Sequence, residues 1–200
     1  MTVVTHRRRV RLLVISGTAG IVAAVVAVGV LALQPQPGSV IGGGSAGVVV
    51  DAFPAGSTVT YGLQTIGNGD PERAIELISI EPRIGTPSLD VRGPAMLAGP
   101  DRVDVLGAGM FDVLPGWPIA GLELSAVSGT TVAAGIETAY EVVVPVTVPT
   151  VEEGMGRIDG FTILYTLDGR RYTETTSMTL VLCPLENTAR CDAFDPNSEP

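Results

Sequence analysis

Apolar and polar side chains alternate along much of the chain after residue 47, which is the period of a β-strand with one buried face. The clearest run is 138–149, "TAYEVVVPVTVP". One face of this run is apolar and carries Tyr140, Val142, Val144, Val146 and Val148. Pro145 falls on the other face and cannot donate a ladder hydrogen bond, so we expect this strand at the edge of a sheet.

A β-hairpin is predicted for residues 161–183, "FTILYTLDGRRYTETTSMTLVLC". Alternate positions of its two arms are apolar: Phe161, Ile163, Tyr165 and Leu167, then Tyr172, Met178, Leu180 and Leu182. Asp168-Gly169 lies between the arms, and this dipeptide favours a tight turn in which two successive residues have positive φ angles.

Two more strands are predicted before residue 83. Residues 57–66 alternate regularly, and Asn68–Asp70 then gives a turn signal. Residues 73–82 also alternate, but their phase shifts between Leu77 and Ile78, which predicts a β-bulge.

These strands, with frequent Gly and Pro breaks and no amphipathic helix, predict a mainly β domain over residues 48–191. We expect a two-layer antiparallel β-sandwich, because two packed sheets bury one face of every strand. A small closed β-barrel is the alternative.

A different pattern precedes the strands. Residues 12–33 carry no charge, and about twenty apolar residues in a helix span a bilayer core of about 30 Å. Arginines crowd the N-terminal flank, so the positive-inside rule predicts a single-pass type II protein of the plasma membrane. Residues 1–11 would be a basic cytoplasmic tail, and everything after the helix would lie outside. The alternative is a cleaved signal peptide ending near Val30–Ala32.

The remaining segments are predicted to be irregular. Residues 34–47, "QPQPGSVIGGGSAG", are rich in Gly, Pro and Ser and are typical of a flexible linker. Residues 192–200 are polar and acidic and are expected to be a disordered tail.

The net charge of the chain limits the classes of partner that it can bind. All twelve cations are arginine, and the net charge is −9. Four arginines lie in the first eleven residues, so removing them leaves −13 for the rest. A surface this acidic repels nucleic acid, and no nucleic-acid partner is expected.

Composition also narrows the chemistry. The chain has no lysine, and its one histidine, His6, falls in the predicted cytoplasmic tail, so an external site could use neither residue. We predict no cofactor and no metal. Three pairs of acids keep a carboxylate hydrolase open as an alternative: Asp101 with Asp104, Glu152 with Glu153, and Asp192 with Asp195. A small-ligand or metal-binding module is the other alternative.

Two features suggest structural or interface roles. Cys183 and Cys191 are the only cysteines, and export to an oxidising compartment predicts that they form a disulfide. Trp117 is the lone tryptophan, flanked by Gly116 and Pro118. We expect it to close one end of the core, and an interface anchor is the other interpretation.

Three stretches carry a resemblance to a protein family: "RRRVRLLVISGTAGIVAAVVAVGVLAL", "TVTYGLQTIGNGDPERAIELISIEP" and "GFTILYTLDGRRYTETTSMTLVLC". Together they resemble actinobacterial single-pass envelope proteins with an immunoglobulin-like β-sandwich outside the membrane. The resemblance implies fold and location and transfers no functional residue. We therefore expect a membrane-anchored, non-enzymatic envelope protein whose external domain contacts another envelope component, either a protein or the cell wall.

Overall fold

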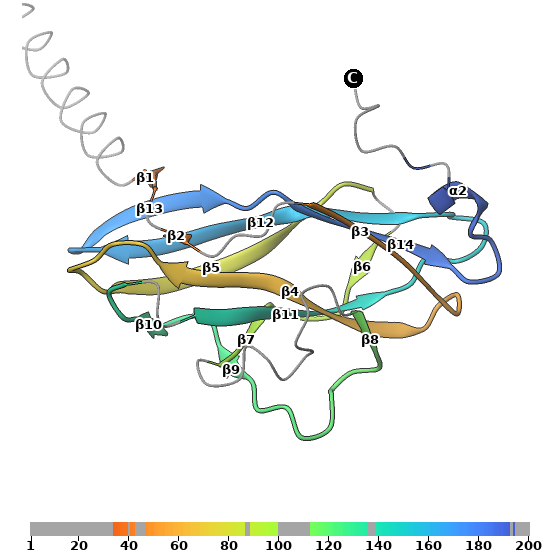
Figure 1. Ribbon diagram of the computed structural model, residues 1–200, viewed down its shortest axis with the longest axis horizontal. Coiled ribbons are helices and arrows are strands. Elements are labelled where there is room, and N and C mark those ends of the chain that lie inside the picture. The colour runs from red at the N-terminus through yellow and green to blue at the C-terminus, as the bar shows by residue number, and fades with distance from the viewer. Residues whose placement is uncertain are drawn as a thin grey trace, which may run out of the picture. The chain divides into compact units, whose positions relative to one another are not determined.

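The computed structural model describes residues 34–39, 41–42, 47–86, 89–99, 113–135, 139–192 and 194. The chain divides into two units, Met1–Pro35 and Gln36–Pro200, and nearly all described residues belong to the second. This part is mainly β and forms two sheets, as predicted (Figure 1). Among the described residues no helix is long and apolar enough to cross a membrane, and the predicted segment 12–33 lies outside them, as does the predicted tail 1–11.

The first sheet is organised around a long central strand, β12 (Gly156–Leu167). One side of β12 pairs antiparallel with β5 (Ile75–Ile84). The other side pairs antiparallel with β14 (Met178–Pro184) near its start and with β13 (Arg170–Thr175) near its end. β13 and β14 therefore act as two halves of one return strand, and the predicted hairpin is present.

Shorter strands complete the edges of this first sheet. β3 (Gly47–Phe53) runs parallel to β14, and β1 (Gln36–Pro37) runs parallel to β13. β10 (Thr131–Val132) pairs antiparallel with the beginning of β5. The predicted all-antiparallel arrangement is therefore wrong for β1 and β3, because period-two alternation reports which face is buried but not the direction of the neighbouring strand.

The second sheet is organised around β11 (Ala139–Thr147) and β4 (Thr58–Asn68), which pair antiparallel. β6 (Asp90–Val91) and β7 (Met96–Ala98) pair with the other side of β11. β11 is therefore an interior strand, and the prediction of an edge strand from Pro145 is wrong.

The chain around Pro145 explains how an interior strand tolerates proline. The Pro145 carbonyl accepts a hydrogen bond from the Arg92 N–H at 3.0 Å, so the position that lacks an N–H faces the same neighbour. That neighbour is interrupted there, because residues 92–95 separate β6 from β7. The gap leaves no ladder acceptor waiting for the missing donor.

The remaining elements are short. β2 (Ile41–Gly42) and β8 (Val113–Pro115) pair with the free side of β4, and β9 (Ser125–Ala126) pairs with β7. A one-turn helix, α2 (Ala189–Asp192), follows β14. Within the predicted flexible linker, residues 34–47, β1 and β2 both pair with the domain. Of the predicted disordered tail, residues 192–200, Asp192 belongs to α2, and residues 193 and 195–200 lie outside the described residues.

Local signals in the sequence are well reproduced. Asp168 and Gly169 have φ angles of 51° and 74°, as the tight turn requires. The register of β5 against β12 shifts so that Leu164 pairs with Ser79 and Tyr165 with Leu77, which confirms the bulge at Ile78.

The core lies between the two sheets and draws side chains from both. Tyr61 of β4 stacks on Phe161 of β12 with ring centroids 5.8 Å apart, which joins the centres of the sheets. Most of the predicted inward-facing residues are fully buried: Val142, Val144, Phe161, Ile163, Tyr165, Leu180 and Leu182. Tyr140 is partly buried and packs against the same cluster.

Candidate functional site

A groove of about 450 Å³ lies beside β5, where the edges of the two sheets approach each other. The first sheet contributes residues 78–82 of β5. The second sheet contributes residues 93–96, which lead into β7, and residues 126–128, which start with the last residue of β9. Three separate segments of the chain therefore build this groove.

The sequence of β5 explains why the groove is open at this place. Leu77 exchanges the last hydrogen bonds with the segment before β10, donating to Thr130 at 2.9 Å and accepting from Gly129 at 2.9 Å. The bulge at Ile78 follows immediately. Within the described residues no strand pairs with this side of β5 beyond Leu77. In the described part of the chain, the edge of β5 is therefore free along the groove.

The lining is chiefly apolar. Ile80, Ala95 and Val127 are buried, with exposed fractions of 5%, 6% and 7%, and they form its base. Among the described lining residues Glu81 is the one charged side chain, and Ser79 and Ser128 add hydroxyl groups. An apolar groove beside a free strand edge matches the requirements of an extended peptide, whose backbone pairs with the edge while alternate side chains enter the groove.

The outer face of the second sheet carries a separate apolar cluster. Trp117 is half-buried and packs with Leu114, Ile119, Leu122 and Leu124 against two buried residues, Ala98 and Val143. Trp117 thus covers the outside of a sheet, and the expectation that it closes the end of the core between the sheets is wrong. The interface interpretation of Trp117 stays a prediction.

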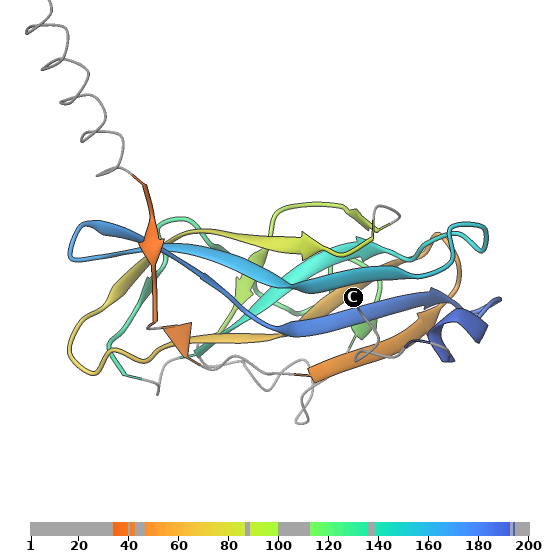
Figure 2. The same cartoon turned by 90° about the horizontal axis from the view of Figure 1, so that it is seen from above.

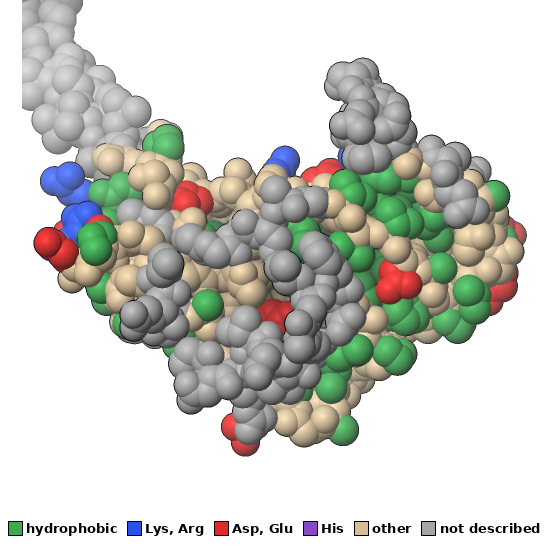
Figure 3. Space-filling view, in the orientation of Figure 1, with side chains coloured by type: hydrophobic (Ala, Val, Ile, Leu, Met, Phe, Trp, Pro, Cys, Tyr) green, Lys and Arg blue, Asp and Glu red, His purple; other side chains and the backbone are tan. Residues whose placement is uncertain are grey.

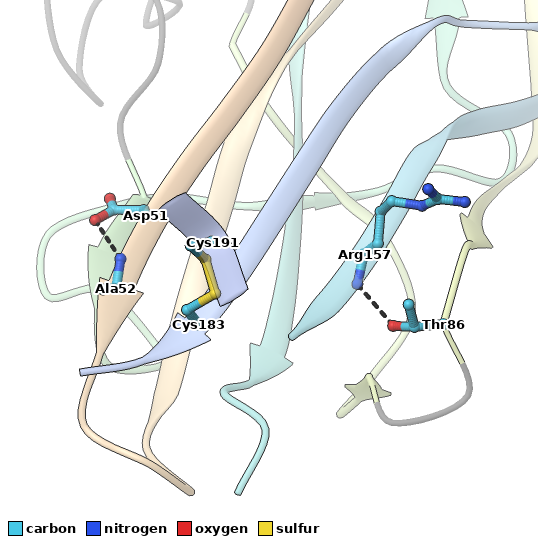
Figure 4. Close-up of a disulfide and its surroundings, with 6 residues drawn as sticks. All are labelled: Asp51, Ala52, Thr86, Arg157, Cys183 and Cys191. Atoms are coloured by element: carbon cyan, nitrogen blue, oxygen red, sulfur yellow. Dashed lines mark hydrogen bonds between the residues drawn. A yellow bond between two sulfur atoms is a disulfide. The ribbon is translucent and has the colours of Figure 1, made fainter. Parts of the chain in front are cut away.

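The two cysteines are joined in a disulfide (Figure 4). This bond lies at the end of the first sheet opposite the β12–β13 turn (Figure 1). Their Cα atoms are 6.2 Å apart, within the usual range for a disulfide. Cys183 lies on β14 and Cys191 on α2, so the bond fastens the helix to the sheet. Val181 and Phe194 pack around it.

A charged cluster connects the start of β5 to the hairpin turn. The Asp70 carboxylate accepts hydrogen bonds from the backbone N–H groups of Glu72 and Arg73 at 3.0 and 2.9 Å, and it pairs with the Arg73 guanidinium. The same guanidinium reaches Asp168 at 3.0 Å. The Arg73 side chain, followed by these backbone donors, lowers the pKa of Asp70 to about 2. This cluster fastens a loop to a turn, and the lowered pKa of Asp70 is the opposite of what a general acid requires.

The predicted acid pairs do not form a site in the described part of the chain. Glu152 and Glu153 lie exposed in a turn, where Glu153 accepts hydrogen bonds from the Thr150 N–H and hydroxyl at 2.8 Å each. These bonds lower the pKa of Glu153, whereas a general acid needs a raised pKa. Asp101, Asp104 and Asp195 lie outside the described residues, and Asp192 belongs to α2.

Two buried polar atoms lack a hydrogen-bond partner among the described residues: the Tyr61 hydroxyl and Gln64 Oε1. Burial raises the pKa of Tyr61, which keeps its hydroxyl neutral. Neither residue lines the groove, so neither supplies chemistry to it.

The groove was not predicted from the sequence. The phase shift at Ile78 marks the place where edge pairing stops, and this is the one local signal that points toward it. The other two walls come from residues whose proximity to β5 depends on the tertiary fold.

The described residues contain no group of three His, Cys, Asp or Glu side chains placed to hold a metal ion. Comparison of the chain with protein-family models and with curated proteins finds no match.

Proposed function

We propose that this chain is a membrane-anchored, non-enzymatic envelope protein whose β-domain binds an extended segment of another envelope protein. The observation that carries the proposal is the apolar groove beside the free edge of β5. The backbone of the partner would continue the first sheet, and its apolar side chains would enter the groove above Ile80 and Val127.

Charge indicates the character of this partner. Glu81 lies in the groove, and the chain beyond the first eleven residues carries a net charge of −13, from the total of −9 less four N-terminal arginines. Such a surface favours a segment with basic residues flanking an apolar stretch. Binding of that kind weakens as salt concentration rises.

The topology supports an immunoglobulin-like β-sandwich. The second sheet has the strand order β2-β4-β11-β7, and the first sheet has β3, then the β14–β13 strand, then β12 and β5. In the immunoglobulin fold the corresponding orders are A-B-E-D in one sheet and G-F-C in the other. The parallel pairing of β3 with β14 adds a split first strand to the edge beside strand G.

The proposed membrane anchor is the uncharged segment 12–33, which follows the N-terminal arginines. It would hold the domain outside the plasma membrane in a type II orientation. Protease added to intact spheroplasts should then remove the domain and leave residues 1–11 protected inside. A purified protein that begins near Leu33 would instead identify the segment as a signal peptide.

Binding at the groove can be tested by site-specific photo-crosslinking in the native membrane. A crosslinking amino acid at Ser128, which is exposed and lines the groove, should form adducts with the partner. Replacing Ala126 with Trp fills the groove from an exposed position and should remove most of these adducts. Ala134→Trp is the matched control, since Ala134 is also exposed but does not line the groove. Equal loss in both variants, or no loss in either, would contradict groove binding.

A further inference from the structure

We propose that the end of the domain where β12 turns into β13 rests on the phospholipid headgroups of the membrane, held there by Arg170 and Arg171. This inference depends on the membrane anchor of the proposed function. It adds an orientation to that function and identifies a second interaction surface, distinct from the groove.

The chain enters the domain through β1, close to the β12–β13 turn. β1 pairs with β13, with Gln36 opposite Tyr172 and Pro37 opposite Thr173. The Gly38 N–H donates to the Thr173 carbonyl at 2.9 Å, which continues this pairing. β1 thus lies beside β13, within a few residues of its turn with β12 (Figure 2).

The tether to the membrane is short. Only two residues, Gln34 and Pro35, lie between Leu33, the last residue of the uncharged segment, and Gln36 in β1. The three Cα–Cα steps from Leu33 to Gln36 span at most about 10 Å even when fully extended. Pro35 and Pro37 stiffen this connection. The headgroup layer on one side of a bilayer is itself about 5–8 Å thick. A membrane-embedded segment that ends at Leu33 therefore brings the β12–β13 turn to the headgroups.

The charges at this turn suit phosphate groups. Arg170 and Arg171 are exposed, and as successive strand residues they point to opposite faces of the hairpin. In the described part of the chain neither makes an ion pair. Guanidinium groups bind phosphate oxygens through paired hydrogen bonds. Two such groups at one end of an otherwise acidic domain favour the end that meets the lipid.

Nearby carboxylates are already engaged. Asp70 and Asp168 both pair with Arg73, and Glu174 accepts hydrogen bonds from the Tyr165 hydroxyl and the Ile41 N–H. Glu72 and Glu76 are exposed near the start of β5 and oppose the attraction in part. The space-filling view shows basic side chains at the end of the domain where the β12–β13 turn lies, at the left (Figure 3).

This orientation places the groove relative to the membrane. Ile80, at the base of the groove, pairs with Ile163, four residues before the end of β12 at Leu167. At the rise of a β-strand this separation is about 13 Å. The segment that binds the groove would therefore be held close to the membrane surface, which favours a partner anchored in the same membrane.

The test uses the full chain, reconstituted in phospholipid nanodiscs and, separately, in maltoside micelles, which contain no phosphate. Hydrogen–deuterium exchange is followed in the peptide that covers residues 167–172. We expect exchange to be on the order of tenfold slower in nanodiscs than in micelles, because both arginines would be held at the lipid surface. The protection should disappear in Arg170→Gln/Arg171→Gln and persist in Arg83→Gln, an exposed arginine at the opposite end of β5.

The outcomes separate this inference from the anchor itself. A protein that does not incorporate into nanodiscs contradicts the anchor and everything built on it. A protein that incorporates but shows equal exchange in nanodiscs and micelles overturns the headgroup contact alone. Protection in micelles on adding inorganic phosphate would overturn membrane docking in favour of a soluble anion site. The comparison of exchange in nanodiscs and micelles needs only the wild-type protein. It therefore tests the proposal even if the double variant is unstable.

Discussion

The two edges of the first sheet are finished in different ways. At one edge, β3 covers the whole length of β14 in a parallel pairing of seven residue pairs. At the other edge, β10 covers only the first part of β5, and the groove begins where that pairing stops. A free strand edge invites another chain, so the contrast separates an edge built to stay closed from one left open.

The β3 edge carries a feature that discourages further pairing. Asp51 shares the inward face of β3 with buried Val49, and its carboxylate accepts a hydrogen bond from the Ala52 N–H at 2.8 Å (Figure 4). A charge on the inward face of an edge strand makes an added strand costly. Val50 is nevertheless 46% exposed on the outer face of β3. β5 instead presents apolar residues at its open edge, and Glu81 alone supplies charge there.

The largest loss of stability is expected in the core between the two sheets, which supports both edges. Val144 of β11 is fully buried, and Val144→Asp places an unpaired charge among apolar side chains. We expect a loss of about 3–5 kcal/mol of unfolding free energy, measured by chemical denaturation. Val151→Asp is the matched control, because Val151 is 42% exposed. Similar losses in the two variants would show that the core assignment is wrong.

A smaller effect, confined to the β3 edge, is expected from removing the disulfide. Cys183→Ser/Cys191→Ser should cost about 2–3 kcal/mol, the entropy of closing a short loop in the unfolded chain. Hydrogen exchange should quicken in β14, β3 and α2, while β5 should keep its protection. Reduced wild-type protein serves as the control and should have the same melting temperature as the double variant. Free thiols in the untreated protein, open to alkylation before denaturation, would contradict the predicted bond.

The junction of β12 with β14, which lies between the two edges, gives a third effect. Gly160 has a φ of 79°, and a Cβ at this position would collide with the Thr176 backbone carbonyl. Gly160→Ala should therefore cost about 1–3 kcal/mol through backbone strain and displacement of Thr176. Gly56→Ala is a sharp control, because Gly56 has a similar φ of 72° but open space around the added Cβ. Equal melting temperatures for the two variants would mean that the contact with Thr176 is unimportant.

These features differ in how far the sequence could predict them. The hairpin turn at Asp168-Gly169 and the bulge at Ile78 depend on neighbours in the chain, so their signals are local and both were predicted correctly. The buried faces of β4, β11 and β12 follow from alternation alone. The mainly β class follows from the same pattern.

Strand neighbours could not be predicted in this way. Pro145 suggested an edge, but tolerance of proline depends on the gap between β6 and β7, which alternation does not encode. The Gly- and Pro-rich composition of residues 34–47 hid the pairing of β1 and β2. The groove combines three distant segments, and Trp117 covers a sheet face that becomes a surface only after folding.

The smallest predicted effect is a loss of stability in acid at the β5 edge, which the β3 edge should not share. Asp70 precedes β5, and its pKa is lowered to about 2 chiefly by the Arg73 side chain. A lowered pKa stabilises the fold above the ordinary pKa of aspartate, about 4, and this stabilisation is lost as pH falls from about 4 toward 2. Acidification should therefore speed hydrogen exchange at the start of β5 and at the hairpin turn before it affects β3.

Asp70→Asn provides the decisive comparison for this pH effect. The amide oxygen can still accept the backbone hydrogen bonds of Glu72 and Arg73, but the charge that titrates is removed. The variant should be less stable than wild type at pH 6, and the difference should shrink toward pH 2, where the wild-type carboxylate becomes protonated. Glu153→Gln is the control, because Glu153 also has a lowered pKa but lies in the 150–153 turn, away from β5. If Glu153→Gln altered exchange at the start of β5 as strongly as Asp70→Asn, acid sensitivity would be a property of the whole domain, and the two edges would not differ in this respect.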